Sequence, residues 1–230
     1  MIENKIIIGD SIIYRQGLKR LVYYPKMLFG NSIKIDSRPK RTINYINDND
    51  NYLKLKEYEY IFIQIGIVDC YPRYKLKKGN KIDINKYSVD SEIETFENNI
   101  KKLVNVLVPN FNKLILISIV QPPKQYTMVR NHNYSEIIKK QVFLYNNIFK
   151  KYAETHKFVY YVDIDDKFQN KYNIDEYLAD ASGHVYPNKE IVFKYAKIIK
   201  EALLELQIPG LNFDNFEKII KKKKENEKKI

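Results

Sequence analysis

The sequence has one cysteine, three histidines, seven glycines and no tryptophan among its 230 residues. Cys70 has no partner for an internal disulfide, and no cluster of Cys and His has the spacing of zinc ligands. The longest apolar stretches, such as 114–120, are far shorter than the roughly 18 residues of a membrane span, and the first residues lack a secretory-signal pattern. We therefore expect a cytoplasmic protein that is stabilised by its hydrophobic core and uses no metal or organic cofactor.

Positive charge exceeds negative charge, with 40 Lys and Arg against 28 Asp and Glu and a net charge of +12. Residues 217–230 contribute seven Lys and three Glu to this balance. Because blocks of like charge are usually solvated, we expect the run from Lys221 to Lys224 to lie in a frayed basic tail. No signature of an RNA-recognition, KH, zinc-finger or helix-turn-helix domain is present, which argues against a nucleic-acid partner.

Short apolar runs of strand length recur along the chain, at 5–9, 32–36, 60–65, 113–119 and 158–164. Segments between most of them have a helical period of apolar residues, notably 12–27, 91–108, 134–156 and 189–206. Apolar strands that alternate with helices predict a parallel sheet covered on both faces. We predict one α/β domain over residues 1–210, a three-layer α/β/α sandwich with a five-stranded parallel sheet in flavodoxin-like order, followed by a tail over 211–230.

Candidate catalytic residues follow the predicted strands, at the carboxyl edge where open parallel sheets bind ligands. A serine hydroxyl becomes a nucleophile when a histidine accepts its proton, and a carboxylate then holds the imidazole in the right tautomer. Ser11 follows the first strand, and Asp180 and His184 follow the last. These three residues could form a catalytic triad, although Gly9-Asp10-Ser11 alone also suits an ordinary turn that caps a helix.

Four segments in this order resemble the SGNH (GDSL-like) hydrolase superfamily over residues 4–204. They are Ile-Ile-Gly-Asp-Ser at 7–11, Gln-Ile-Gly-Ile-Val-Asp at 64–69, Tyr-Asn at 145–146 before Val-Asp at 162–163, and the segment 180–184. The resemblance implies that Ser11 is the nucleophile and that Asp180 and His184 complete the triad. It also implies an oxyanion hole made by the Ser11 N–H, a glycine N–H and an asparagine side chain.

The oxyanion hole departs from the family pattern at two places. The family's Gly-x-Asn-Asp reads Gly66-Ile67-Val68-Asp69 here, so apolar Val68 replaces the asparagine, and losing one such donor costs about 10²–10³ in turnover. The loop 36–41 has no glycine, so its backbone donor would come from Ser37 or Arg38. The longer motif Gly-Ile-Val-Asp-Cys-x-Pro-Arg at 66–73 resembles a variant branch associated with bacterial surface polysaccharides.

The late Asp and His are also one residue further apart than in the family, a difference that Gly183 could absorb. Cationic side chains on the loops expected near Ser11 have two interpretations, solvated surface or a site for an anionic group. In the second, Arg73 and at least one of Arg38, Lys40 and Arg41 point into the Ser11 cleft and stabilise negative charge there.

Other polar residues have structural interpretations. We expect Asp69 to brace loops, Gln64 to be a satisfied buried amide and Cys70 to be a small buried thiol. Asp163, Asp165 and Asp166 are interpreted as a solvated turn rather than a metal site.

The sequence therefore favours a serine esterase or acyl-transfer enzyme that acts on a small ester, anionic or carbohydrate-linked, in surface-polysaccharide metabolism. The main alternative is an SGNH-like protein that has lost esterase chemistry and binds an anionic or glycan ligand. A basic nucleic-acid-binding protein is the third and weakest alternative.

Overall fold

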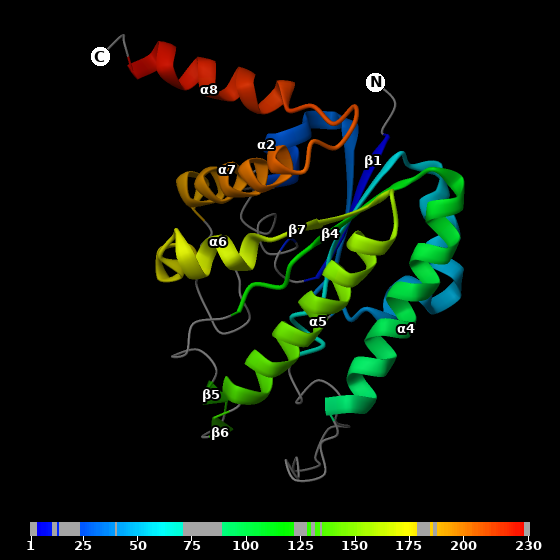
Figure 1. The fold of residues 1–230 in the computed structure, drawn as a ribbon. Coiled ribbons are helices and arrows are strands. Elements are labelled where there is room, and N and C mark those ends of the chain that lie inside the picture. The colour runs from blue at the N-terminus through cyan, green and yellow to red at the C-terminus, as the bar shows by residue number, and fades with distance from the viewer. Residues whose placement is uncertain are drawn as a thin grey trace.

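A parallel sheet of five strands forms the centre of the molecule, as Figure 1 shows. The computed structural model describes residues 4–10, 13, 24–39, 41–70, 89–121, 128–129, 132–133, 135–178, 185 and 188–227. The strands are β1 (Lys5–Gly9), β2 (Ile33–Ser37), β3 (Tyr60–Gln64), β4 (Lys113–Ile117) and β7 (Val159–Val162). Their order is β2-β1-β3-β4-β7, with every neighbouring pair parallel, which confirms the predicted flavodoxin-like sheet.

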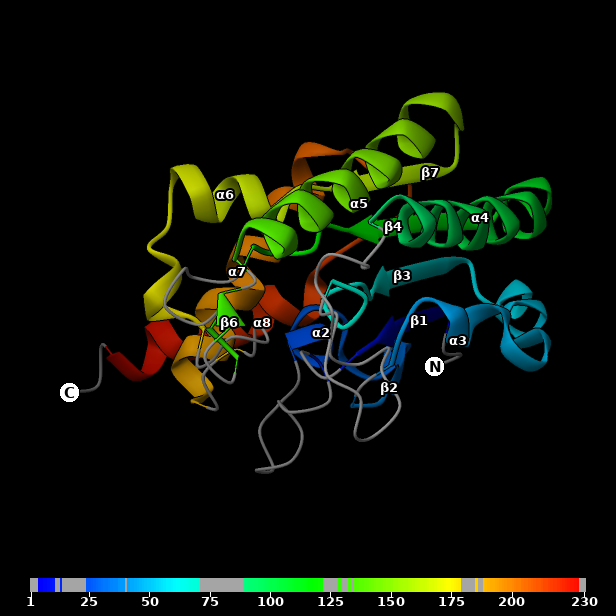
Figure 2. The same ribbon diagram turned by 90° about the horizontal axis from the view of Figure 1, so that it is seen from below.

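Helices cover both faces of this sheet, so the predicted three-layer sandwich is confirmed (Figure 2). One face carries α3 (Asn44–Asn47), the 3₁₀ segment η2 (Asp48–Glu57), α4 (Val89–Leu107) and α5 (Ser135–Thr155). The other carries α2 (Tyr24–Phe29), α7 (Lys189–Glu205) and α8 (Asp214–Glu227), with α6 (Ile164–Asn170) beside α7. The remaining elements are short: η1 (Gly30–Ser32), η5 (Val108–Asn110), η7 (Ile174–Glu176) and a hairpin of β5 (Met128–Val129) and β6 (His132–Asn133).

The long helices follow from the apolar spacing of the sequence. In α4, Phe96, Ile100, Leu103, Val104 and Leu107 recur every three or four residues and are all buried against the sheet or its neighbouring helix. The observed bounds of α4, α5 and α7 differ from those predicted by no more than two residues. No helix in the described part of the chain is long and apolar enough to cross a membrane.

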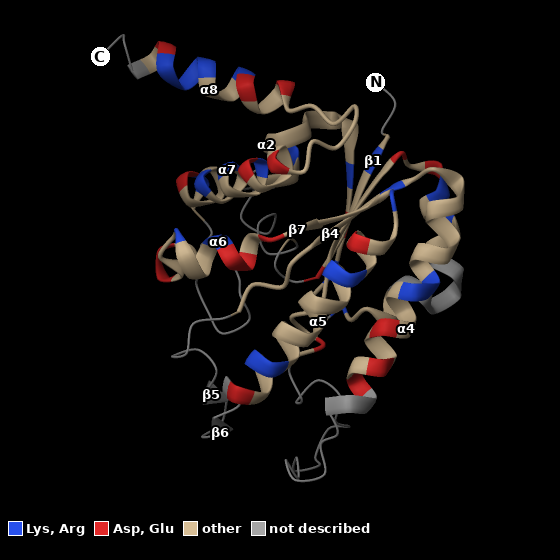
Figure 3. Cartoon of the chain, in the orientation of Figure 1, with Lys and Arg blue, Asp and Glu red and all other residues tan. Residues whose placement is uncertain are grey.

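The segment after residue 210 differs from the frayed tail that we expected, because residues 214–227 form helix α8. Phe216 at its start is fully buried, and Asn215 Nδ2 donates to the carbonyl oxygens of Lys26 (3.0 Å) and Met27 (2.8 Å) in α2. Lys221 to Lys224 are exposed in the outer half of this helix, which projects from the body of the protein (Figure 3). The basic run is solvated as expected, but it belongs to a helix that begins in the core.

Candidate active site

The carboxyl edge of the sheet brings together the ends of β1, β2, β3, β4 and β7, which precede the positions of the candidate site residues. Ser11, Arg73, Asp180 and His184 themselves lie outside the described residues, as does Lys40. The structure therefore describes residues that come before and after these positions in the chain. Ser37, Arg38 and Gly66 are described, and so are the residues directly before Ser11 and after His184.

A buried polar network lies directly behind the end of β1. Gln64 at the end of β3 accepts a hydrogen bond from Tyr24 Oη (2.7 Å) and donates one to Tyr195 Oη (3.1 Å), which confirms that it is a satisfied core amide. Asp10 is fully buried, and its backbone N–H donates to the Gln64 carbonyl (3.4 Å). Burial, followed by the nearby Asp10 carboxylate, raises the pKa of Tyr195. Burial also raises the pKa of Tyr24, with smaller contributions from Tyr195 and Asp10. The residue before Ser11 is thus bonded to β3 at Gln64, whose side chain is in turn held from α2 and α7.

The turn after β3 depends on a glycine at position 66. Gly66 has a φ of +137°, and a Cβ built on it would lie 2.3 Å from Ile119 Cδ1, so another residue would be strained at this φ and would displace the Ile119 side chain. Val68 in this turn is buried, and its apolar side chain offers no hydrogen-bond donor. Asp69 is buried and accepts a hydrogen bond from the Ile43 N–H (3.1 Å to Oδ2), which confirms that it braces the loop after β2.

Of the two described cations in the loop after β2, Arg41 is fixed away from solvent and Arg38 is exposed. The Arg41 side chain forms an ion pair with Asp36 Oδ1 (2.7 Å), donates to the Asp36 carbonyl (2.6 Å) and lies over the Tyr45 ring. Arg41 is therefore engaged by its own loop and is removed from the cations expected to bind an anion beside Ser11. The Arg38 backbone N–H donates to the Gly9 carbonyl (3.2 Å), so Arg38 could take that role with its exposed side chain and not with its backbone. Ser37 pairs with Gly9 in the ladder of β1 and β2.

Side chains of α5 and α6 fix the segment after β4. Asn146 accepts from the Ile119 N–H (2.8 Å) and donates to the Ile119 carbonyl (2.9 Å), so both backbone polar groups of Ile119 are satisfied. The Ser118 hydroxyl accepts from the N–H groups of Ile164 and Asp165 at the start of α6 (2.9 Å each). This arrangement positions the backbone of β4 at its carboxyl end.

The aspartates after β7 do not form the solvated turn that we expected. Asp163 caps α6 by accepting from the Asp166 N–H (3.0 Å), and the partly buried Asp165 accepts from the Gln121 N–H (2.7 Å). Burial raises the pKa of Asp165 from 3.8 to about 6. The sequence signal missed here was the helix-capping pattern, an Asp before Ile164 with further acidic residues in the first turn.

An isolated antiparallel bridge joins Leu178 to Val185, and both residues are buried. The two ends of the segment that contains Asp180 and His184 are therefore adjacent. Helix α7, which carries Tyr195 to the buried network, begins four residues after Val185.

The Cys70 side chain, which also lies near this edge, is fully buried, as expected for a small core thiol. Among the described residues, no group of three or more His, Cys, Asp or Glu side chains could hold a metal ion.

Solved structures with this fold include several hydrolases. An acetylxylan esterase from Geobacillus stearothermophilus has a TM-score of 0.59 and 15% identity over 87% of this chain and 94% of its own. An alpha/beta hydrolase from the metagenome of Lake Arreo, Spain, has a TM-score of 0.58 and 16% identity over 89% and 95%. A GDSL-like lipase from Bacteroides thetaiotaomicron has a TM-score of 0.56 and 18% identity over 88% and 89%.

These solved structures resemble this chain in their fold alone. At these identities the sequences have diverged too far to transfer a substrate or a reaction. The sequence matches no protein-family model, and it matches no curated protein significantly.

Proposed function

We propose that this protein is a serine esterase or acyl-transfer enzyme, with Ser11 as nucleophile and Asp180 and His184 as its partners. The observation that carries the proposal is the place of Ser11 in the chain, two residues after the end of β1, a strand that lies between β2 and β3 in the sheet. That edge is where parallel α/β folds act on ligands, and the similar solved structures are esterases and hydrolases. Two of them are catalytic mutants of the acetylxylan esterase, with serine and aspartate replaced by alanine.

In the proposed reaction the Ser11 hydroxyl attacks the ester carbonyl while His184 accepts its proton. The tetrahedral intermediate collapses to an acyl-enzyme, and His184 gives the proton to the departing alcohol. Water or an acceptor alcohol then attacks the acyl-enzyme, again with His184 as base, and Ser11 is regenerated. Asp180 holds the imidazole and stabilises its cation. The network of Asp10 and Gln64 supports this arrangement, because it fixes the residue before the nucleophile.

The oxyanion would be stabilised by the backbone N–H groups of Ser11 and Gly66, with positive charge from Arg38 and Arg73. Val68 supplies no donor, so the developing charge depends more on the guanidinium groups than in the family pattern. We therefore propose a small ester with an anionic or carbohydrate-linked alcohol, from the surface-polysaccharide class of substrates, as the preferred substrate.

The burial of Val68 also favours a second candidate function, in which the cleft binds such an anionic or glycan ligand without hydrolysing it. The two candidate functions differ in one respect: the esterase forms a covalent bond between Ser11 and its substrate, whereas the binding protein does not. A fluorophosphonate probe reacts only with an activated serine, whereas a binding protein would retain ligand affinity without labelling.

The test compares the Ser11→Ala and Ser32→Ala variants. Ser32 is outside the proposed site, and its hydroxyl donates to the Phe29 carbonyl. We expect Ser11→Ala to abolish fluorophosphonate labelling and to lower the hydrolysis of p-nitrophenyl acetate and acetylated xylo-oligosaccharides by at least about 10³-fold. Ser32→Ala should keep both activities. Full labelling of Ser11→Ala would end the serine proposal, and an unlabelled wild type that binds the oligosaccharide would support the binding function.

A further inference from the structure

Strand β7 lies at one side of the sheet and, among the described residues, pairs with β4 alone. We name its outer side, over Val159–Val162, the β7 edge. Figure 1 views the molecule from this side, and no helix or strand lies in front of β7.

The ladder with β4 leaves backbone groups of β7 facing outward. The Leu114 N–H donates to the Phe158 carbonyl (2.9 Å). The Ser118 N–H donates to the Val162 carbonyl (3.0 Å). Because every second residue of a parallel strand bonds to the same neighbour, Tyr161 turns its backbone N–H and C=O away from β4. Within the described part of the chain, neither group bonds to another backbone group.

The two edge strands of the sheet differ in how they are protected from pairing with another chain. The outer strand on the other side, β2, contains Lys34 and Asp36, and charged side chains are a common protection of an edge strand. β7 reads Val-Tyr-Tyr-Val, with no charged residue and no proline. Residues of these β-branched and aromatic types favour strand pairing. The composition of β7 therefore favours the addition of a further strand.

A hollow of about 480 Å³ lies beside β7, between the end of α5 and the residue after α7, Leu206. Four apolar or aromatic side chains in its lining are only partly buried: Ala153, Tyr160, Tyr161 and Leu206. The hollow therefore exposes apolar surface next to the outward backbone groups of Tyr161.

The side of α5 that borders this hollow also carries an exposed phenylalanine. Lys150 and Glu154 line the hollow, and Phe143 lies seven residues before Lys150, on the same side of the helix. The Phe143 side chain is 64% exposed. Aromatic residues are enriched in protein interfaces, so Phe143 extends the apolar surface that the β7 edge offers to a partner.

Exposed residues of opposite charge flank the β7 edge. Lys157 lies in the turn before β7, and Asp166 lies in the first turn of α6 after it. Within the described residues neither makes an ion pair, whereas the neighbouring Lys167 is paired with Glu205 (2.7 Å). Antiparallel pairing of two β7 strands would place Lys157 of each copy near Asp166 of the other. Parallel pairing would instead bring like charges together.

We propose that the β7 edge is a self-association surface, to which a second copy of this chain adds its own β7 in antiparallel orientation around a two-fold axis at Tyr161. The backbone N–H of each Tyr161 then donates to the Tyr161 carbonyl of the other copy. The same surface serves both copies, so the contact closes as a dimer and joins the two sheets into one.

Sedimentation velocity and amide hydrogen exchange test the proposal together. At about 100 µM the full chain should sediment as a dimer, since small interfaces give weak, concentration-dependent association. In this dimer the Tyr161 N–H should exchange slowly by NMR, as slowly as the N–H groups of Tyr160 and Val162, which face β4. A monomer at this concentration would overturn the proposal and leave the edge to a different polypeptide. A dimer with fast exchange at Tyr161 would also overturn it.

Lys157→Glu and Lys56→Glu form a matched pair, because both lysines are exposed and Lys56 lies on η2, over the opposite side of the sheet. Lys157→Glu should weaken the dimer about tenfold, because the charge reversal acts at two symmetry-related contacts. It should also speed exchange at Tyr161 and leave Val162 slow. Lys56→Glu should change neither property. Equal weakening by the two variants would mean a general charge effect and would contradict pairing through β7.

A second pair of variants tests the apolar part of the surface. Phe143→Ala should weaken the dimer, whereas Leu53→Ala, an exposed apolar residue on η2, should not. Both side chains are exposed, so the melting temperature of the monomer should stay nearly unchanged in each variant. A dimer that Phe143→Ala and Lys157→Glu both leave intact would place the contact elsewhere on the molecule and end the proposal.

Discussion

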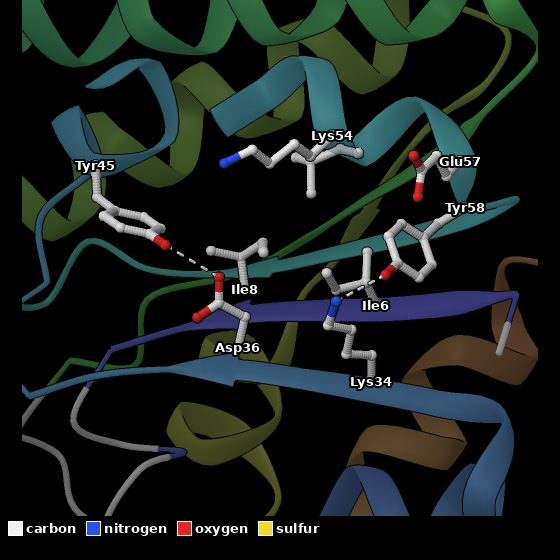
Figure 4. Close-up of a pocket in the computed structure, with 9 residues that line it drawn as sticks. Ile6, Ile8, Lys34, Asp36, Tyr45, Lys54, Glu57 and Tyr58 are labelled. Atoms are coloured by element: carbon white, nitrogen blue, oxygen red, sulfur yellow. Dashed lines mark hydrogen bonds between the residues drawn. The ribbon is translucent and has the colours of Figure 1, made fainter. Parts of the chain in front are cut away.

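Two parts of the same sheet face are covered in different ways. Over β3, β4 and β7 lie α4 and α5, helices of 19 and 21 residues, and the Phe96 ring of α4 stacks on the Tyr145 ring of α5 with 3.9 Å between centroids. Over β1 and β2 lie the four residues of α3 and the ten of η2, and a cavity of about 370 Å³ remains between η2 and the strands (Figure 4). The comparison shows that an unbroken apolar stripe fills the space above a sheet, whereas a polar covering segment leaves a cavity.

The largest expected effect comes from making the same substitution in both parts. Leu103 of α4 is fully buried, and Leu103→Ala should lower the free energy of unfolding by about 3 to 4 kcal/mol, because it creates a cavity in a filled core. Leu55→Ala should cost less, about 1 to 2 kcal/mol, because Leu55 already borders open space. Urea unfolding of the two variants measures the difference. Equal losses would show that the two parts are packed equally well.

Gly66→Ala should have the next largest effect, about 2 to 3 kcal/mol, from the close contact with Ile119 and the positive φ. The double variant with Ile119→Val removes the Cδ1 atom that the new methyl group would meet, so it should recover part of the loss. Thermal unfolding of both variants checks this. If the double variant lost more stability than the two single variants lose together, the steric explanation would fail.

The smallest expected effect is a pH dependence of the free energy of unfolding that is caused by Asp165. This residue follows the carboxyl end of β7, in the part of the sheet that the long helices cover. Its pKa is about 6 in the folded protein and near 3.8 without burial, so between these values the folded state holds a proton that the unfolded chain has released. The free energy of unfolding therefore decreases as the pH rises from about 4 to 6. Asp165→Asn should remove this slope and raise stability above pH 6 by at most about 2 kcal/mol.

The control for this prediction is Asp166→Asn, which removes a charge from an exposed neighbour. It should retain the slope between pH 4 and 6. Urea unfolding at a series of pH values distinguishes the two variants, and a slope that survives in Asp165→Asn would assign the titration to another group.

The sheet and the three longest helices could be predicted because their signals are local and continuous. Each strand is an apolar run, and connection rules left few strand orders to consider. The segment 44–57 gave no such signal, since its polar residues follow no helical period, and the start of α8 was hidden by the basic run that follows Phe216.

The candidate site could be predicted only in part, because its contacts join residues far apart in the chain. Asp69 was interpreted correctly as a brace, but its partner Ile43 lies 26 residues away and could not be named. The ion pair of Arg41 with Asp36 depends on how the loop after β2 turns, so the sequence could not separate it from a cation in the cleft. The triad of Ser11, Asp180 and His184 remains a prediction.

The hydrogen bonds from Asn215 to the carbonyl oxygens of Lys26 and Met27 also bear on how the chain is made. They join positions 189 and 188 residues apart, and Phe216 is buried beside them. During synthesis α2 leaves the ribosome nearly 190 residues before its partner in α8. Contacts of such long sequence separation form late. The nascent chain must therefore keep the apolar face of α2 from aggregating until residues 215 and 216 have also emerged.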